Sequence, residues 1–499
     1  MEVKFGKTAC PYLRRAVCQI QNQEQTQEVR LTEAMPDIGS VLGSWGQVLI
    51  RGKEWRSGSM GVSGGVMVWV LYAPEDGSQP RSIETWIPFQ FSWDLPETQR
   101  DGAICVTPML KGVDARSTSA RKLMVRANVS MLGEALEPVE ADVFVPDGLD
   151  GDIQLLKKSY PMELAQEAGE KLFQIEEELT LPGALPTVEQ ILRYELIPEV
   201  TEQKVMAGRL VFRGKAQLHL LYCGADGSIH SWDREIPISQ FAELDRDHST
   251  NASGWIIVVP TALELEKAED GRLLLKASMA AQYVIYDRKM LEIVEDAYSP
   301  ERAVAVEMTE LYLPARLDVV RNRLRLESAV QTQGEGVVDV CWLPEFPVRR
   351  INGDSVELTL PGQFQVLYTD GEGLLHSASS KAEESWCLPS DSENIVESYC
   401  RTDGRPQAVF NGDSGALAAD MVVETAVFSE KGMQAVCGLE IGEPKASDPD
   451  RPSLLLRRAG DGGLWNIAKE CGSTVEAICK ANQLDGEPDK NKMLLIPLG

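Results

Sequence analysis

The stretch that decides the fold is KAQLHLLY at residues 215–222, followed three residues later by Asp226-Gly227. Polar and apolar side chains alternate along it, as they do in a strand with one face in a core. The Asp-Gly pair then favours a tight turn, because glycine adopts positive φ without a steric penalty. Residues 66–72 and 363–368 repeat the pattern, and each ends in a tyrosine with an Asp-Gly turn shortly after it. The sequence therefore predicts a β-hairpin that occurs three times.

Three copies of a longer unit surround these hairpins. The tyrosines Tyr72, Tyr222 and Tyr368 are separated by 150 and 146 residues. Pro36 and Pro186 each lie 36 residues before the first two tyrosines, and similar apolar stretches open 51, 51 and 49 residues after the three tyrosines. The third copy lacks the upstream proline and is degenerate. Self-similarity at a fixed period indicates repeated structural units, so we expect three β-sandwich-like units.

Composition limits the classes of function. The 499 residues include 43% hydrophobic and 25% charged side chains, and 76 acidic against 49 basic residues give a net charge of −27. A surface this negative repels phosphate backbones and anionic lipids, so neither nucleic acid nor membrane is an expected partner. No apolar run is long enough for a membrane span or a signal peptide. Ten cysteines form no C-x-x-C pair, which favours free thiols in a reducing cytoplasm.

The C-terminal residues follow a different pattern. Residues 443–452 contain three prolines among polar residues and are expected to be a linker. Beyond them, LLL at 454–456 predicts a strand, Gly460-Asp461 a turn, and LWNIAK at 464–469 the start of a helix. A second helix is expected after Gly472, up to about Asn482, and MLLIP at 493–497 predicts a closing strand. Residues 453–499 carry six Lys/Arg and six Asp/Glu, so this βααβ module is neutral and the remainder is acidic.

Two family resemblances follow from these motifs. The order P-x-(I/V)-x-x-(I/V)-L, then (V/L)-L-Y, Asp-Gly and Ile-Pro resembles the SPOCS domain of endospore-forming bacteria, over most of residues 34–442. The terminal module resembles a LysM domain across its length. We therefore expect a mainly β protein with these parts: an N-terminal tail (1–30), SPOCS-like repeats at 31–160, 161–298 and 299–442, a linker (443–452) and a LysM domain (453–499).

The LysM resemblance implies a set of binding residues. LysM modules bind N-acetylglucosamine polymers in a groove between the first turn and helix and the loop before the last strand. By resemblance, one side of that groove comprises Gly460, Asp461 and Leu464, and the other Asn482, Leu484 and Asp485. Trp465 and Ile467 of the first helix join the set, with Leu464, Ile467 and Asn482 as the expected centre of an interface. Trp465 is also interpreted as a core residue, because one large aromatic supplies much of the buried area in so small a module.

The combined architecture is similar to that of SipL-like spore coat morphogenetic proteins. The resemblance implies a non-enzymatic scaffold in the mother-cell cytoplasm at the forespore surface, whose LysM domain binds the stage IV sporulation ATPase. The alternative is a peptidoglycan- or N-acetylglucosamine-binding component of a cell wall or phage tail. A hydrolase with a LysM targeting tail is the third possibility, and the motifs give it no support.

No catalytic, metal-binding or cofactor-binding residues are predicted. The four histidines lack companions at metal-ligand spacing. His230 and His376 each lie eight residues after a repeat tyrosine, where the first unit has Pro80, so this position is expected to belong to the hairpin. GDSG at 412–415 is similar to the nucleophile loop of trypsin-like proteases, but the nearest histidine is only 38 residues upstream. A turn before the next strand is the better interpretation.

Overall fold

The computed structural model describes residues 1–96, 102–353, 355–389, 394–429, 432–445 and 452–498. These residues form strands almost throughout, and two short helices lie near the C-terminus. The prediction of a mainly β protein is confirmed. In the described ranges, no helix is long and apolar enough to cross a membrane.

The first unit contains two three-stranded antiparallel sheets, ordered β2-β7-β6 and β3-β4-β5. Apolar side chains of both sheets meet in one core, as in a β-sandwich. The strands of this unit are β2 (Gly6–Arg30), β3 (Ile38–Arg56), β4 (Ser59–Pro74), β5 (Arg81–Asp94), β6 (Ala103–Ser119) and β7 (Lys122–Val145).

The second unit repeats this plan with sheets ordered β12-β13-β8 and β11-β10-β9. Its strands are β8 (Gln154–Leu179), β9 (Val188–Met206), β10 (Arg209–Gly224), β11 (Ile229–Glu243), β12 (Ser253–Lys267) and β13 (Leu273–Tyr298). Two four-stranded sheets form the third unit, in which β15 and β20 flank β22, β21 also pairs with β22, and β16, β17 and β19 all pair with β18. Its strands are β15 (Arg316–Val330), β16 (Gly336–Pro344), β17 (Val348–Asn352), β18 (Ser355–Thr369), β19 (Leu375–Pro389), β20 (Ile395–Thr402), β21 (Gln407–Asn411) and β22 (Ser414–Phe428).

The repeat tyrosines show why the proline spacing exists. Tyr72 donates a hydrogen bond from Oη to the carbonyl of Pro36 at 3.1 Å, and Tyr222 does the same to Pro186 at 3.2 Å. In the third unit, which lacks the proline, the hydroxyl of Tyr368 bonds to Thr332 Oγ1 at 2.6 Å. All three rings lie in the core of their own unit. The motif therefore ties the start of each unit to its central hairpin.

The residue before each tyrosine joins the units. Successive side chains of a strand point to opposite faces, so these leucines leave the sandwich cores. They meet in one apolar cluster with residues of all three units: Leu42, Trp45, Leu71, Leu192, Leu221, Cys223, Cys341 and Leu367. The three units thus pack around a common line, and together they are called the body below.

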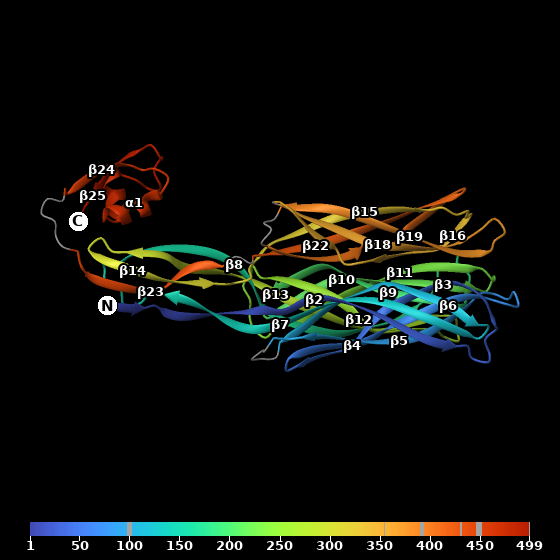
Figure 1. The fold of residues 1–499 in the computed structure, drawn as a ribbon. Helices are drawn as coiled ribbons and strands as arrows, with labels where there is room; N and C mark the ends of the chain where they lie inside the picture. Colours follow the sequence, from blue (N-terminus) through green and yellow to red (C-terminus); the bar gives the residue numbers. More distant parts are fainter. Residues whose placement is uncertain (97–101, 354, 390–393, 430–431, 446–451, 499) are drawn as a thin grey trace.

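A narrower stalk extends from the body (Figure 1). It consists of residues 1–15, 137–165, 286–315 and 432–445. The long ribbons β2–β7 and β8–β13 run from the body into the stalk, and β14 (Arg302–Leu311) and β23 (Met433–Pro444) form a third ribbon, with β1 (Glu2–Lys4) on the other side of β23. Two apolar clusters fill the space between the ribbons.

Three expected boundaries are corrected. Residues 1–30 are not a tail: β2 pairs with β7 along its whole length, from Gly6 with Val145 to Arg30 with Lys122. The sequence did not indicate this strand, because β2 lies at the edge of its sheet and carries mostly polar side chains. Its glutamines Gln21 and Gln23 donate hydrogen bonds to backbone carbonyls of β5 at 2.8 Å. The boundary at 160/161 falls inside β8. Pro444, expected in the linker, ends β23 at a strand terminus, where proline is tolerated; linker residues 446–451 lie outside the described residues.

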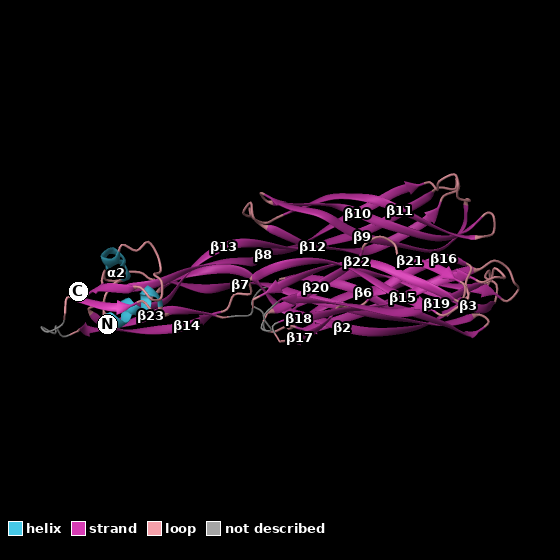
Figure 2. Ribbon diagram, turned by 90° about the horizontal axis from the view of Figure 1, so that it is seen from above, coloured by secondary structure: helices cyan, strands magenta, loops and turns pink. Residues whose placement is uncertain are grey.

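The C-terminal module (residues 453–498) has the order β24 (Leu454–Arg458), α1 (Gly463–Cys471), α2 (Val475–Asn482) and β25 (Met493–Pro497). Its two strands pair antiparallel, Leu454 with Pro497 and Arg458 with Met493 at the ends. Both views place the module beside the stalk, at the end far from the body (Figures 1 and 2).

Candidate functional site

The predicted site residues belong to the module, whose turns have clear local causes. Gly472 ends α1 in the left-handed region with φ 65°, which glycine adopts at little cost. Thr474 then caps α2, because its side chain accepts a hydrogen bond from the backbone N–H of Ala477 at 3.1 Å. The helices pack against β24 and β25 around a core that includes Ala459, Leu464, Ile467, Ala468, Ile478, Leu494 and Ile496.

The start of α1 and the loop before β25, the two expected sides of the groove, are joined by contacts of Glu487 and Lys490. The N-cap of α1, Gly462, has no side chain to satisfy the first free N–H groups of the helix. The Glu487 carboxylate does so instead, accepting from the N–H of Leu464 at 3.0 and 3.3 Å. Gly460 donates to the carbonyl of Lys490 at 2.8 Å, and the Lys490 ammonium pairs with Asp461 at 2.6 Å. The loop before β25 therefore covers the start of α1.

Glu487 and Lys490 were missed by sequence reasoning. A helix that begins with two glycines and no capping side chain needs an acceptor from elsewhere in the chain. That requirement was the available signal for an acidic residue in the loop before the last strand.

The remaining predicted residues have unequal exposure. Leu464 and Ile467 are 3% and 2% exposed and lie in the core of the module, so they offer no side-chain surface to a partner. Leu484 packs against that core, whereas Asp485 is exposed.

Asn482 forms hydrogen bonds within the module. Its side-chain amide donates to the carbonyls of Ile478 and Leu495 at 2.8 and 2.6 Å, and its Oδ1 accepts from the N–H of Leu495 at 2.8 Å. The amide thus pairs with the backbone N–H and carbonyl of Leu495, as a neighbouring strand would, and links the end of α2 to β25.

Asn482→Ala is expected to lower the unfolding free energy of the module by about 1–3 kcal/mol, because the backbone groups of Leu495 lose their partners. Thermal unfolding followed by hydrogen exchange of β25 would measure this change. Asn466→Ala, an exposed position on α1, is the control and should change stability by less than about 0.5 kcal/mol. Equal effects of the two substitutions would contradict the assignment.

Trp465 contacts the stalk, through residues that sequence reasoning also missed. Its Nε1 donates to Asp296 Oδ2 at 2.8 Å, and its ring meets the Tyr298 ring edge-on with centroids 4.8 Å apart. One helical turn later, Lys469 Nζ bonds to both carboxylate oxygens of Asp296 at 2.7 Å. Tyr298 Oη donates to the carbonyl of Ser473 at 2.9 Å. Asp296 and Tyr298, at the end of β13, are called the seat below.

The charge of Asp296 and the burial of Tyr298 both favour the contact between the seat and the module. Burial would raise the pKa of the Asp296 carboxyl, but Lys469 and Trp465 outweigh it and hold the pKa below its ordinary value. Tyr298 is 4% exposed and is a member of the core cluster of the module. Trp465 is therefore both a packing residue, as the sequence indicated, and a contact between the module and the rest of the protein.

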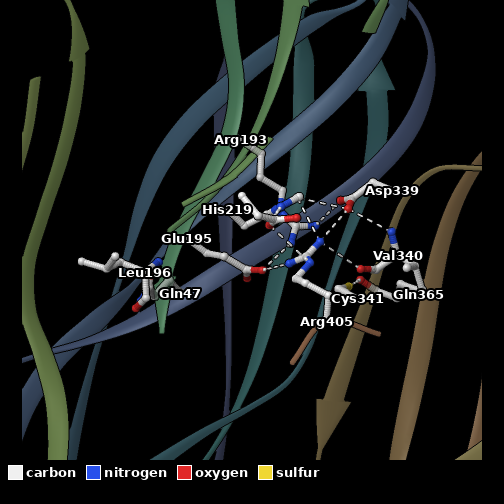
Figure 3. Close-up of polar contacts among 11 residues, drawn as sticks. Gln47, Arg193, Glu195, Leu196, His219, Asp339, Val340, Cys341, Gln365 and Arg405 are labelled. Carbon is white, nitrogen blue, oxygen red and sulfur yellow. Dashed lines mark hydrogen bonds and ion pairs between the residues drawn. The ribbon is translucent and has the colours of Figure 1, made fainter. Parts of the chain in front are cut away.

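A second polar site lies in the body, where the second and third units meet (Figure 3). Arg193 of β9 pairs with Asp339 of β16 at 3.0 Å, and the two side chains are 1% and 2% exposed. Glu195 accepts from Arg193 at 3.0 Å, and Arg405 contacts both Glu195 and Asp339, at 3.2 and 3.1 Å. His219 of β10 bonds to Asp339 at 3.1 Å.

One further contact involves the first unit: the Trp45 ring lies 5.0 Å from the guanidinium of Arg193. All three units thus contribute to this junction.

Asp339→Asn is expected to destabilise the body by about 1.5–3 kcal/mol, because buried donors of Arg193, His219 and Arg405 lose a charged acceptor between the second and third units. Denaturant unfolding of the full chain would measure the loss. The double variant Arg193→Met with Asp339→Leu removes both charges and should recover much of it, since well-packed apolar pairs often replace buried ion pairs without loss. A single variant as stable as the wild type would contradict this role.

His219 makes the junction sensitive to pH. Burial lowers the pKa of this histidine, but the charge of Asp339 and hydrogen bonds to Asp233 and Asp339 outweigh it, so the pKa lies above 6.5. With neutral histidine, the cations that pair with Glu195, Asp233 and Asp339 among the described residues are the two guanidiniums of Arg193 and Arg405. Protonation of His219 balances these charges.

The histidine therefore adds stability that is fully present below pH 6.5 and is lost as pH rises through the folded pKa. The unfolding free energy of the wild type should fall over that range relative to His219→Gln. Denaturant midpoints measured at a series of pH values, at constant ionic strength, would show the difference. Parallel profiles for the two proteins would contradict the proposed protonation.

The other histidines also bond to carboxylates. His230 and His376 contact Asp226 and Asp370 of their own hairpin turns, at 3.0 and 2.8 Å, as expected for a hairpin position. His248 bonds to Glu167 at 3.0 Å. In the GDSG segment, Gly412 and Asp413 form the turn between β21 and β22, and Ser414 and Gly415 begin β22.

One group of potential metal ligands occurs in the described residues: Cys18, Glu134 and Glu397. Arg15 lies among them and forms ion pairs with both carboxylates. Burial raises the pKa of Glu134 to about 7, with Arg15 opposing and Glu397 adding to the shift. The guanidinium thus supplies the positive charge that an ion would bring.

These features define a class: a mainly β protein built from sandwich units, with a small α/β module seated on its stalk. Residues 187–255, which cover β9 to β11 and the start of β12, match the family model described as SipL, SPOCS domain. The match identifies a SPOCS domain in the second unit and relates the protein to sporulation. No curated protein and no solved structure matches the chain. The number of SPOCS repeats and the LysM assignment stay predictions.

Proposed function

We propose that the protein is a non-enzymatic scaffold of spore coat assembly, which acts in the mother-cell cytoplasm at the forespore surface. In this proposal the module is a LysM domain that docks the body to the stage IV sporulation ATPase of the coat basement. The observation that carries the proposal is the SPOCS match within a unit that is packed into one elongated, acidic body. The titratable clusters described above are ion pairs between strands, as expected for groups with a structural role.

The exposed sheet face of the module is the surface that we assign to the ATPase. Leu454 and Leu456 of β24 share a face with Met493 and Leu495 of β25, by the register of the two strands. Their exposed fractions are 49%, 63%, 48% and 39%. Exposed apolar patches of this kind mark interaction sites. A neutral module on an acidic chain also approaches another protein with less charge repulsion than the body does.

The glycan alternative finds less support in the module. Glu487 occupies the start of α1, and the amide of Asn482 is used within the fold. A sugar would have to displace these contacts. Binding to peptidoglycan is therefore an outcome for the test to exclude.

Deletion of residues 453–499 is expected to abolish recruitment to the forespore, seen by fluorescence of a tagged chain in sporulating cells. Leu456→Asp should weaken binding to the ATPase at least about tenfold, since a charge in an apolar contact costs more than about 1.4 kcal/mol. Leu172→Asp, at a leucine of β8 that is 64% exposed, is the matched control.

Normal localisation of the truncated chain would refute the docking role. Retention of the full chain on purified peptidoglycan, with loss of that retention in the truncated chain, would favour the cell-wall alternative.

A further inference from the structure

The contact between the module and the seat is small and specific. Asp296 and Tyr298 join the module to the rest of the protein by hydrogen bonds. The Asp296 carboxylate accepts from Trp465 and Lys469, which are four residues apart and lie on the same side of α1. Tyr298 donates to the carbonyl of Ser473, two residues after the end of α1. Tyr298 completes the apolar core of the module.

Among the described strand ends that enter the stalk, the one from the second unit carries this seat. In the first unit, β7 ends at Val145 and is followed by Pro-Asp-Gly at 146–148; in the third, β23 ends with Gly-Glu-Pro at 442–444. Neither terminus carries an acidic residue two positions before a tyrosine. Each chain therefore has one seat and one module that fits it.

We propose that this contact is exchanged between copies, so that the module of one chain occupies the seat of a second chain. Every copy presents the same Asp296 carboxylate and Tyr298 ring, so the exchange needs no new surface. The module is tethered through residues 445–452, a segment that spans at most about 25 Å when extended. When the module of a chain leaves its seat, the module of a second copy of this protein occupies that seat.

Tethering decides the balance between the two arrangements. A short linker gives an effective concentration on the order of millimolar for the contact within one chain. In dilute solution the module of each intact chain therefore binds the seat of its own chain, whereas crowding of chains on a surface favours exchange. Because each copy has one seat and one module, exchange gives either a reciprocal pair or an open chain of copies. This inference goes beyond the proposed function and does not depend on it.

The test uses two full-length variants that are complementary. Asp296→Lys removes the seat and leaves an intact module, whereas Lys469→Asp spoils the module and leaves an intact seat. Neither variant can form the wild-type contact within one chain or with another copy of itself. When they are mixed, the intact module of the first meets the intact seat of the second.

Analytical ultracentrifugation would measure the masses at concentrations up to about 1 mM. Each variant alone should sediment as a monomer of 55.0 kDa, and an equimolar mixture should shift to twice that mass. Hydroxyl-radical footprinting should show that the side chains of Trp465 and Tyr298 become accessible in each variant alone and are protected again in the mixture. The spore-coat partner is absent from this experiment, so its result is separate from the docking test above.

The control pair carries the same charge changes away from the contact. Glu292→Lys lies on an exposed position of β13, and Lys480→Asp on an exposed position of α2. Their mixture should remain monomeric. If charge reversal unfolds the module, a milder complementary pair is Asp296→Ala and the double variant Trp465→Phe with Lys469→Met. The first has no acceptor for α1, and the second has no side-chain donor for Asp296 but keeps an aromatic ring.

The proposal is overturned by a mixture that stays monomeric over this range of concentration. It is also overturned if the control mixture dimerises equally, or if the Trp465 and Tyr298 side chains stay protected in the single variants. A dimer formed only by the complementary pair supports it.

Discussion

The ion pair between Arg193 and Asp339 is the interaction on which the arrangement of the three units depends. Both charges are buried, and their desolvation is offset by Glu195, His219 and Arg405. The three units offer different residues at the same place: 29 positions before the repeat tyrosine lie Gly43, Arg193 and Asp339. Units of similar fold can therefore associate in one order only, because a different order would bury an unpaired charge.

The leucines of the common apolar cluster supply attraction between the units. They do not discriminate between possible orders of the units, since each unit contributes the same residue type. The junction adds that discrimination, because its buried charges differ between the units. The stalk extends the body because each unit sends one ribbon beyond its sandwich. The module lies beside this stalk, at the end far from the three units (Figure 1).

Much of the fold could be predicted because it is encoded locally. The alternation at 215–222, the Asp-Gly turns and the spacing of Tyr72 from Pro36 each report a contact within one unit. Residues 1–30 were misassigned because an edge strand with glutamines on its half-buried face and polar residues on its exposed face lacks the apolar signal of a core strand. Of the predicted site, Leu464 and Ile467 were recognised as module residues, but their burial depends on how the helix rotates against β24 and β25.

The sequence by itself determined the strands, the hairpins, the repeat period and the order of elements in the module, because these follow from side-chain alternation, turn chemistry and helix caps within short segments. Only the tertiary structure decided which side chains meet across units and across the stalk. Arg193 and Asp339 lie 146 residues apart, and Tyr298 and Trp465 lie 167 apart. No local pattern links such pairs, since their contact is set by packing of whole sheets and by the need to compensate charge removed from water.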